Sequence, residues 1–461
     1  MTAARTTDLL VLGSGIAGQT TATAAAEAGL DVLLAEKTDR LGGSTVMSGG
    51  WFAFSDTDEQ RAEGVEDSAE LFLQDMLSVG EHRNDVALLH AYLDRQEQTY
   101  RWLQAHGVVF REIEISSGQS AKRSHNSAIV DVMAGLHGQF TAAGGTTLLE
   151  HRATTLVTDA TGTVTGARLD GPDGPVDVHA RQGVVLATGG FSRGAELLRI
   201  FAPEQLAAIP FGGRGNTGDG LRMAWKLGAD MADMSTVTGT YGSHPDTGDV
   251  HELLTAYYMG AIIVNRDGRR FIDESLSYKT LGRAVLDQPD GLGVQIFDAT
   301  VRAKSHRGIP LKDMDTLEEK GHLHRAETLE ALAAQVGVDA DALVDTVERY
   351  NRVAREGGED EVGRASLCNG VGALAPIERA PFYAYPAKSL MTTTYCGVRV
   401  TPDAEVVDVD GAVIPGLYAV GEVVGGFHGA AYMTGTSLGK GAVFGLHVAA
   451  QAADRATRSA A

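Results

Sequence analysis

The sequence predicts an α/β protein in which a Rossmann-like nucleotide-binding domain is interrupted by an inserted α+β domain. Residues 8–37 read as a strand, a glycine turn, an alanine-rich helix and a second strand, which together make a βαβ unit. Strand-like segments and a small-residue helix return near the C-terminus, at 397–407, 417–421 and 437–453. Between these ends the composition shifts toward aromatic and charged residues. The expected domains are therefore a nucleotide-binding domain at 1–234 and 381–461, and an inserted domain at 235–380.

The middle elements follow in the order of the chain. Polar stretches with helical spacing cover 58–106. Residues 153–187 alternate as meandering strands do, and they end in the apolar run 183–187. Within the expected insertion, 328–350 carries a clear helical pattern. The chain is too long for one compact core, which agrees with an insertion.

Composition narrows the class of protein. Of 461 residues, 43% are hydrophobic and 21% are charged, as in ordinary globular proteins. The 39 Lys and Arg residues against 60 Asp and Glu residues give a net charge of -21, without a basic cluster, so we expect no nucleic-acid partner. The cysteines, Cys368 and Cys396, imply neither a disulfide framework nor a metal site. Because no export signal or membrane-length apolar run is visible, we expect a soluble, cytoplasmic protein.

A glycine pattern, Gly13-Ser-Gly-Ile-Ala-Gly18, follows the first expected strand and opens the helix. Gly13 suits the tight turn, Gly15 lets a pyrophosphate approach the backbone, and Gly18 permits close helix packing. Glu36 ends the next strand, where an acidic residue accepts hydrogen bonds from ribose hydroxyls. The pattern predicts a dinucleotide site but does not separate FAD from NAD.

Further glycine-rich segments occur at both ends of the chain: Leu41-Gly-Gly-Ser44, Ser48-Gly-Gly50, Ala187-Thr-Gly-Gly190, Thr217-Gly-Asp-Gly220, Gly416-Leu-Tyr-Ala-Val-Gly-Glu422 and Gly435-Thr-Ser-Leu438. With the first motif they resemble the fumarate reductase and succinate dehydrogenase flavoprotein superfamily over nearly the whole chain. The resemblance implies a glutathione-reductase-type FAD-binding domain and a substrate-capping insertion. The residues that it assigns to FAD are Gly13, Gly15, Ala17, Gly18, Glu36, Lys37, Gly42, Gly43, Ser44, Ser48, Gly49, Gly50, Val157, Thr188, Gly189, Asp219, Glu422, Ser437 and Leu438.

By the same resemblance, Glu422 binds the ribityl chain, and the helix beginning near Ser437 directs backbone N–H groups at the flavin pyrimidine. A positive helix end there favours the anionic reduced flavin. Superfamily members with covalent flavin carry a histidine just before the second glycine-serine stretch. Residues 43–49 contain none, so we expect noncovalent FAD.

The chain departs from fumarate reductases at the residues that hold a dicarboxylate. Where the superfamily has its proton-donating arginine, four residues after the glutamate of Gly268-Arg-Arg-Phe-Ile-Asp-Glu274, this chain has Tyr278. At the positions of a substrate-binding histidine and arginine it has Thr393 and Tyr432. His244, in Ser243-His-Pro245, does match a site histidine.

The substitutions instead resemble ketosteroid dehydrogenases, in which phenols replace the arginines because the substrate is a ketone. Tyr432-Met-Thr434-Gly435 is similar to the tyrosine-x-serine-glycine of enzymes that introduce a double bond next to a keto group. This resemblance implies that Tyr432 and the Gly435 N–H bind the carbonyl, and that Tyr278 removes the α-proton. A nearby Lys279, or a charged His244, would lower the pKa of the tyrosine base.

The candidate residues thus fall into two groups. Expected catalytic residues are Tyr278, Tyr432, Thr434 and His244. Expected substrate contacts are Gly435, Tyr395, Thr393 and His428. The pair Arg269 and Arg270 is interpreted as a solvated face or as support for Glu274.

The expected function is FAD-dependent desaturation of a 3-oxosteroid or a smaller alicyclic ketone, with an unidentified electron acceptor. A fumarate-type ene-reductase of an unsaturated acid is the first alternative, with Arg399 and Lys279 as carboxylate ligands. A non-catalytic carrier or escort protein that retains the flavin fold is the second. Intact motifs at both ends of the chain argue against it.

Overall fold

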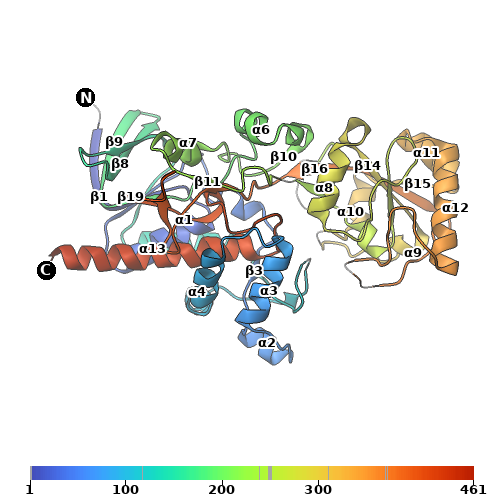
Figure 1. Ribbon diagram of the computed structural model, residues 1–461, viewed down its shortest axis with the longest axis horizontal. Helices are drawn as coiled ribbons and strands as arrows, with labels where there is room; N and C mark the ends of the chain where they lie inside the picture. Colours follow the sequence, from blue (N-terminus) through green and yellow to red (C-terminus); the bar gives the residue numbers. More distant parts are fainter. Residues whose placement is uncertain are drawn as a thin grey trace. The chain divides into compact units, whose positions relative to one another are not determined.

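The computed structural model describes residues 3–116, 118–237, 239–247, 252–309, 311–368, 370 and 372–460 (Figure 1). The chain forms two compact units. The first unit contains the residues up to 202, 212–237 and those from 393 onward, and the second contains 203–211 and 238–392. The expected α/β class with parallel strands is confirmed.

A mostly parallel sheet forms the centre of the first unit. Strand β1 (Ala3–Leu12) pairs in parallel with β2 (Val32–Ala35) on one side and with β9 (Gly174–Leu186) on the other. Beyond them, β2 pairs with β6 (Thr146–Leu148), and β9 pairs with β19 (Val413–Ala419). Because β19 comes from the end of the chain, the C-terminal segment completes the sheet that the N-terminus begins.

Antiparallel strands extend this sheet. The meander expected at 153–187 is β7 (Arg152–Thr158), β8 (Val164–Gly171) and β9. On the same side of β9, β18 (Glu405–Val407) pairs with β19. The first unit also contains the short strands β3 (Trp51–Ala53), β4 (Ile113–Glu114), β5 (Ser124–Asn126), β11 (Met231–Ala232) and β17 (Gly397–Val398).

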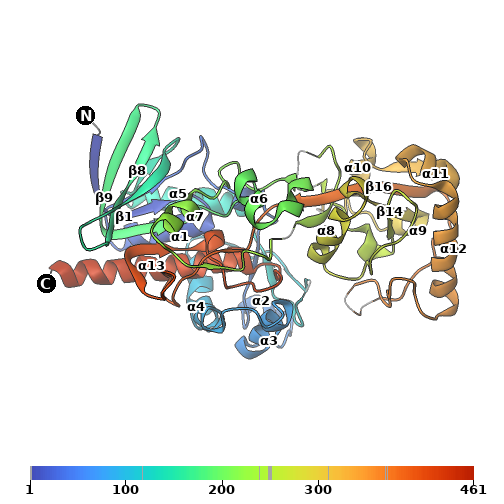
Figure 2. The ribbon, with the colours of Figure 1, turned by 45° about the horizontal axis from the view of Figure 1, so that its top comes forward.

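Helix α1 (Ile16–Glu27) packs against the C-terminal helix α13 (Thr436–Ala460), and the two lie side by side in Figures 1 and 2. Their approach is close, since a Cβ on Gly445 would lie 2.8 Å from the carbonyl oxygen of Ala17. The first unit's other helices are α2 (Asp58–Ala62), α3 (Ala69–Val79), α4 (Val86–Ala105), α5 (Ile129–Ala142), α6 (Ala195–Phe201) and α7 (Asp219–Lys226), with 3₁₀ turns η1 (Thr45–Met47) and η6 (Gly421–Val423).

Strand β16 (Phe382–Met391) organises the sheet of the second unit. It pairs with β10 (Ile209–Pro210), β12 (Thr240–Ser243), β14 (Gly293–Asp298) and β15 (His324–Ala326), and β14 pairs with β13 (Ile262–Val264). The helices are α8 (Tyr278–Leu286), α9 (Ala299–Arg302), α10 (Met314–Glu319), α11 (Leu329–Val336) and α12 (Ala340–Glu356), with 3₁₀ turns η2 (Pro203–Ala207), η4 (Ala256–Met259) and η5 (Pro289–Gly291).

Two hydrophobic cores cover the faces of this sheet, because successive strand residues point to opposite sides. Ile263 and Phe297 lie in one core with Leu281 of α8. The neighbouring residues Ile262 and Ile296 lie in the other core, with side chains of α11 and α12.

A buried ion cluster anchors the segment that leads into α8. Arg270 Nη2 donates to Glu274 Oε2 at 2.6 Å, and Arg270 Nη1 donates to Asp360 Oδ2 at 2.6 Å. Glu274 also accepts from the backbone N–H of Ile263 at 3.0 Å. The side chains of Arg270 and Glu274 are fully buried, whereas Arg269 is exposed. Arg270 therefore supports Glu274, and only Arg269 lies on a solvated face.

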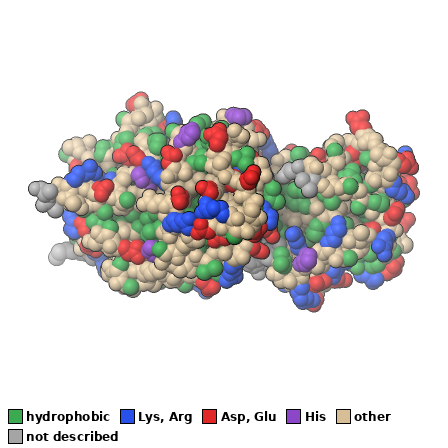
Figure 3. Space-filling model, turned by 90° about the horizontal axis from the view of Figure 1, so that it is seen from below, with side chains coloured by type: hydrophobic (Ala, Val, Ile, Leu, Met, Phe, Trp, Pro, Cys, Tyr) green, Lys and Arg blue, Asp and Glu red, His purple; other side chains and the backbone are tan. Residues whose placement is uncertain are grey.

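Surface charge agrees with the composition. On the face drawn in Figure 3, Lys and Arg side chains lie among Asp and Glu side chains. Among the described residues, no helix combines the length and the apolar composition needed to span a bilayer.

Candidate active site

The first glycine motif forms the turn between β1 and α1. Gly13 has a φ of +107°, which a residue with a side chain rarely adopts, and a Cβ there would lie 2.3 Å from the Ala187 carbonyl oxygen. A Cβ on Gly18, in the first turn of α1 after Ala17, would lie 1.9 Å from the Gly13 carbonyl oxygen. The motif glycines thus bring β1, β9 and α1 into close contact.

Glu36, at the end of β2, is held beside this turn. Its Oε2 accepts a hydrogen bond of 2.6 Å from Ser14 Oγ, and its Oε1 accepts one of 2.9 Å from the N–H of Thr38. Ser14 Oγ in turn accepts from the N–H of Gly42 at 3.0 Å. The expected ribose ligand and the second glycine stretch are therefore linked through Ser14, which the motif analysis did not single out.

The second glycine-serine stretch faces the N-terminus of α1. Thr45 Oγ1 accepts from the N–H of Ile16 at 3.0 Å. Gly43 has open space where a Cβ would stand, whereas a Cβ on Gly50 would lie 2.3 Å from the Ser127 carbonyl oxygen. Of the other expected residues here, Ser48 Oγ donates to the Thr45 carbonyl, and Gly49 lies against Trp51. Gly43 thus borders open space, while Gly50 is required by packing.

Asn216 connects this stretch to Glu422 at the C-terminal end of the sequence. Its Nδ2 donates to Ser44 Oγ at 3.3 Å and to Glu422 Oε2 at 2.8 Å. Glu422 Oε1 accepts from the N–H of Thr394 at 2.9 Å, and burial raises the pKa of the Glu422 carboxyl. Asn216 directly precedes the expected segment 217–220, and no motif spacing identifies it.

Ser437 and Leu438 lie in the first turn of α13, where the backbone N–H groups have no intrahelical acceptor. These groups, the N-terminus of α1, the open space at Gly43 and the carboxylates of Glu36 and Glu422 suit the amide, phosphate and hydroxyl groups of a flavin dinucleotide. The donor and acceptor set therefore fits the expected cofactor.

Other expected cofactor residues contact one another. Lys37 Nζ and Arg152 Nη2 each lie 2.8 Å from a carboxylate oxygen of Asp219. Burial raises the pKa of Asp219, but the hydrogen bonds from Arg152 and Lys37 outweigh burial and leave the pKa below its usual range. Thr188 and Gly189 follow β9, and Val157 lies in β7 with an exposed side chain.

Three expected substrate residues of the first unit form an aromatic cluster. The rings of Tyr395 and Tyr432 stack with centroids 4.8 Å apart and an interplanar angle of 17°. The His428 ring meets them edge-on, at 5.2 Å from Tyr395 and 5.5 Å from Tyr432. Tyr395 has a φ of +56°, a costly conformation for a bulky residue that is often found at functional sites.

Gly435 supplies a hydrogen bond to this cluster. Its N–H donates to Tyr432 Oη at 2.9 Å. Gly435 has a φ of +88°, and a Cβ there would lie 2.7 Å from the backbone nitrogen of Ala53, so only glycine fits. The carbonyl of Thr434 accepts from Gln119 Nε2 at 3.0 Å. Among the described residues, the buried Thr393 Oγ1 has no hydrogen-bond partner.

In the second unit, Tyr278 is the first residue of α8, after the N-cap Ser277. Lys279 is buried, and its Nζ donates to Thr240 Oγ1 at 2.7 Å. The same Nζ lies 5.9 Å from the centroid of the Tyr278 ring. A buried cation is therefore held close to the phenol.

His244 follows β12 and stacks on His322, with ring centroids 4.0 Å apart and an interplanar angle of 4°. Burial, together with the neighbouring His322, lowers the pKa of His244 to about 4. The expectation that a charged His244 assists the tyrosine base is therefore wrong, because this imidazole is neutral near pH 7.

A family model described as "FAD binding domain" matches residues 8–438. The chain belongs to this family. NADH:fumarate oxidoreductase of Klebsiella pneumoniae (strain 342) is 31% identical over 97% of this chain and 48% of that enzyme, so the chain spans about half of that relative's length. 4-Oxocyclohexanecarboxylate 2-dehydrogenase of Sinomonas cyclohexanicum is 28% identical over 97% of this chain and 94% of that enzyme.

Solved structures give the same assignment. An open conformation of a flavocytochrome c3 fumarate reductase matches 98% of this chain and 79% of that chain, with a TM-score of 0.85 and 30% identity. The 3-ketosteroid-Δ4-(5α)-dehydrogenase of Rhodococcus jostii RHA1 matches 97% of both chains, with a TM-score of 0.78 and 28% identity. The protein is an FAD-dependent oxidoreductase of the fumarate reductase and ketosteroid dehydrogenase family, and FAD is its cofactor.

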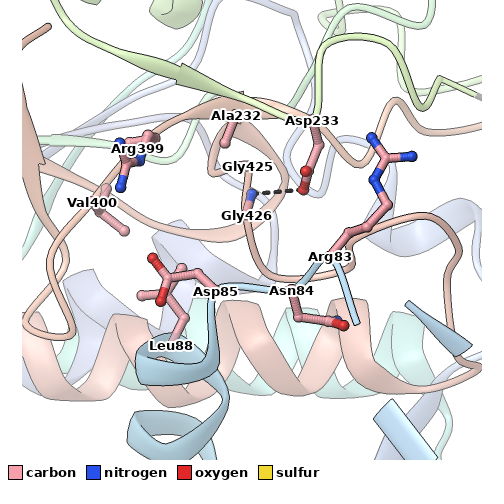
Figure 4. A pocket seen from close by; sticks show the side chains of 10 residues that line it. All are labelled: Arg83, Asn84, Asp85, Leu88, Ala232, Asp233, Arg399, Val400, Gly425 and Gly426. Atoms are coloured by element: carbon pink, nitrogen blue, oxygen red, sulfur yellow. Dashed lines mark hydrogen bonds between the residues drawn. The ribbon is translucent and has the colours of Figure 1, made fainter. Parts of the chain in front are cut away.

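The FAD-binding unit also holds a polar pocket of ≈ 250 Å³ that no motif indicated (Figure 4). In it, Asp233 Oδ2 accepts from the N–H of Gly426 at 2.8 Å. Arg399, a carboxylate ligand in the ene-reductase alternative, lines this pocket and donates to Asp230 Oδ2 at 2.9 Å. None of the expected catalytic, substrate or cofactor residues of the ketone reading is among the lining residues, which are Arg83, Asn84, Asp85, Leu88, Ala232, Asp233, Arg399, Val400, Gly425 and Gly426.

Lys440 is a further buried residue that sequence reasoning missed. It lies in the first turns of α13, and its Nζ donates to the carbonyl of Val424 at 3.0 Å. Burial lowers the pKa of Lys440 to about 8, while the negative charge of Glu422 acts in the opposite direction. Lys440 thus supports the segment between Glu422 and His428, and its burial could not be inferred from its place in a small-residue helix.

Proposed function

We propose that this flavoenzyme oxidises a cyclic ketone to its α,β-unsaturated ketone. The hydrogen bond from the Gly435 N–H to Tyr432 Oη carries the proposal, because it makes the phenol a stronger hydrogen-bond donor toward a carbonyl oxygen. The aromatic rings of Tyr395 and His428 beside them suit an alicyclic substrate. A relative named for 4-oxocyclohexanecarboxylate supports a ketone of this size.

Tyr432 acts as the donor to the ketone. A phenol that accepts a hydrogen bond from a backbone N–H becomes a better donor of its own proton. Donation to the carbonyl oxygen stabilises the negative charge that develops there when the α-carbon loses a proton. Removal of one such donor typically lowers kcat by about 10²- to 10³-fold.

Tyr278 takes the α-proton, a role suggested by its position four residues after Glu274. Loss of the phenol proton is favoured by a nearby cation, and the Lys279 ammonium, 5.9 Å from the ring centroid, supplies it. The buried cluster of Arg270 and Glu274 holds the segment before α8, so that Tyr278 has a fixed backbone position. FAD, when bound in the first unit, would supply the acceptor for the hydride that leaves the β-carbon.

Several contacts weigh against a dicarboxylate substrate. Arg399 forms an ion pair with Asp230 and lines a pocket that contains none of the expected catalytic residues. The Lys279 ammonium is buried and donates to Thr240. Fumarate reductases among the relatives nevertheless make reduction of an unsaturated acid the alternative that the experiment must exclude.

The test is anaerobic bleaching of the visible flavin band of the holoenzyme. Substrates are 4-oxocyclohexanecarboxylate, cyclohexanone, a 3-oxosteroid and succinate. We expect a ketone to bleach the wild type and to bleach Tyr432→Phe and Tyr278→Phe at least about 100-fold more slowly. Tyr383→Phe serves as the control, because Tyr383 lies on β16 and belongs to none of the motifs.

Bleaching by a ketone that is equally fast in all three variants would reject the assigned roles of Tyr432 and Tyr278. Absence of bleaching by every ketone, together with reoxidation of dithionite-reduced enzyme by fumarate, would replace the proposal by the ene-reductase alternative.

A further inference from the structure

Two contacts hold His244 within the second unit, one through its ring and one through its backbone. Its flat contact with His322, at 4.0 Å and 4°, is a parallel stack of two imidazoles. Its backbone N–H donates to Tyr385 Oη at 2.9 Å, and Tyr385 Oη donates to the carbonyl of Glu252 at 2.6 Å. Both the backbone and the ring plane of His244 are therefore fixed.

One nitrogen of the His244 ring has a defined role. The backbone N–H of Asp246 donates to His244 Nδ1 at 3.2 Å. Nδ1 is therefore an acceptor, and a neutral imidazole must carry its proton on Nε2. In this form His244 is a neutral hydrogen-bond donor.

The electrostatic surroundings differ between the two stacked rings. His322 Nδ1 is buried, has no hydrogen-bond partner among the described residues, and lies 3.7 Å from Glu252 Oε2. Lys320 and Thr247 also contact the Glu252 carboxylate. His244 Nδ1 has a carboxylate oxygen, that of Asp246, at 4.0 Å, but the Asp246 side chain is 84% exposed and its charge is screened.

We propose that His322 is a positioning residue for His244. It stacks on the His244 ring and holds it in the orientation in which Nδ1 accepts from the Asp246 N–H and Nε2 carries the proton. A positive charge on one ring opposes a positive charge on the other at 4.0 Å, so the stack also favours the neutral form of His244.

The inference rests on the proposed function in one respect, because the substrate that His244 contacts is the ketone of that function. His324, on β15, also faces this pair and opposes a positive charge on His244, but it is not part of the stack. A neutral donor suits a ketone oxygen over a wide pH range, whereas a charged one would hold a carboxylate. The positioning of His244 by His322 thus supports a neutral substrate that contains a carbonyl group.

The test uses holoenzyme with ¹⁵N-labelled histidine and long-range ¹H–¹⁵N spectra between pH 4.5 and 8. His244→Gln identifies the His244 signals. In the wild type near pH 7 we expect His244 to be neutral, with Nε2 protonated and Nδ1 bare. His322→Phe keeps an aromatic stack without a charge, and His322→Asn removes both. The His244 pKa is expected to rise by about 1 unit in both variants.

His324→Phe is the matched control, because it removes a neighbouring imidazole without removing the stack, and its shift is expected to be smaller. The proposal is overturned if the neutral His244 ring carries its proton on Nδ1, or if the His244 pKa moves by less than about 0.3 units in both His322 variants while far-UV circular dichroism shows them folded. The readout requires no turnover. If the shift is found but His244→Gln still oxidises the ketone at the wild-type rate, His322 keeps its role on His244 and the assignment of His244 to the substrate fails.

Discussion

The buried ion cluster of the second unit gives a sharp test of how the segment before α8 is held. In Glu274→Gln, Arg270 loses its bidentate carboxylate partner and faces an amide N–H₂ group instead. Both native side chains are fully buried, and among the described residues Asp360 is the counter-charge that Arg270 retains. Breaking a buried pair by removing one partner costs about 3–5 kcal/mol, because the remaining charge is left uncompensated.

Urea unfolding of the holoenzyme, followed by far-UV circular dichroism, measures this cost. With a slope of roughly 2–3 kcal/mol per molar urea, the midpoint of the transition that reports the second unit should fall by about 1–2 M. Glu327→Gln is the matched control, because Glu327 pairs with Arg325 at 2.9 Å in an exposed position where a pair contributes less than about 1 kcal/mol. A Glu274→Gln midpoint within about 0.2 M of the control would refute the reasoning.

Three further predictions concern the cofactor, the carbonyl site and pH. Gly18→Ala places a Cβ 1.9 Å from the Gly13 carbonyl oxygen, so we expect the purified variant to have a clearly lower ratio of flavin to protein absorbance. Full occupancy of the flavin site in this variant would contradict the close packing. Gly435→Ala should lower kcat by about 10²-fold at unchanged flavin content, since the N–H is displaced from Tyr432, and unaltered turnover would argue against this donor. Folding lowers the pKa of His244 to about 4. As the pH drops below about 6.5, this histidine therefore binds a proton in the unfolded chain before it does so in the folded protein, and the free energy of unfolding falls. Relative to His244→Gln, the wild type should lose up to about 2 kcal/mol of unfolding free energy between pH 7 and 5, and equal losses in both proteins would contradict the assigned pKa.

Local patterns were sufficient for the nucleotide-binding half of the fold. The β1–α1–β2 unit and the C-terminal helix carry their own strand, turn and helix signals, and the structure has them within a few residues of the expected bounds; α13 extends to Ala460, beyond the expected 453. The parallel order of the sheet followed from the βαβ rule. The domain boundaries at 234/235 and 380/381 and the roles of the site residues remain predictions.

Contacts between distant parts of the sequence could not be predicted in the same way. His244 and His322 are separated by 78 positions, and Arg270 and Asp360 by 90. No spacing rule links such pairs, and burial, which decides the charge of His244, depends on the tertiary fold. For this reason the prediction of a charged His244 was wrong. Tyr395 likewise gives no local sign of its positive φ, since glycine or asparagine is the usual residue there.

The central claim is tested most directly by a single anaerobic turnover with 4-oxocyclohexanecarboxylate deuterated at the carbons next to the carbonyl. Holoenzyme is mixed with excess substrate without an electron acceptor, and the product is analysed by mass spectrometry. Ketone oxidation predicts one enone per bleached flavin, with one α-deuteron released to water. Unchanged ketone, with no enone and no bleaching, while the reduced enzyme is reoxidised by an unsaturated acid, would contradict it.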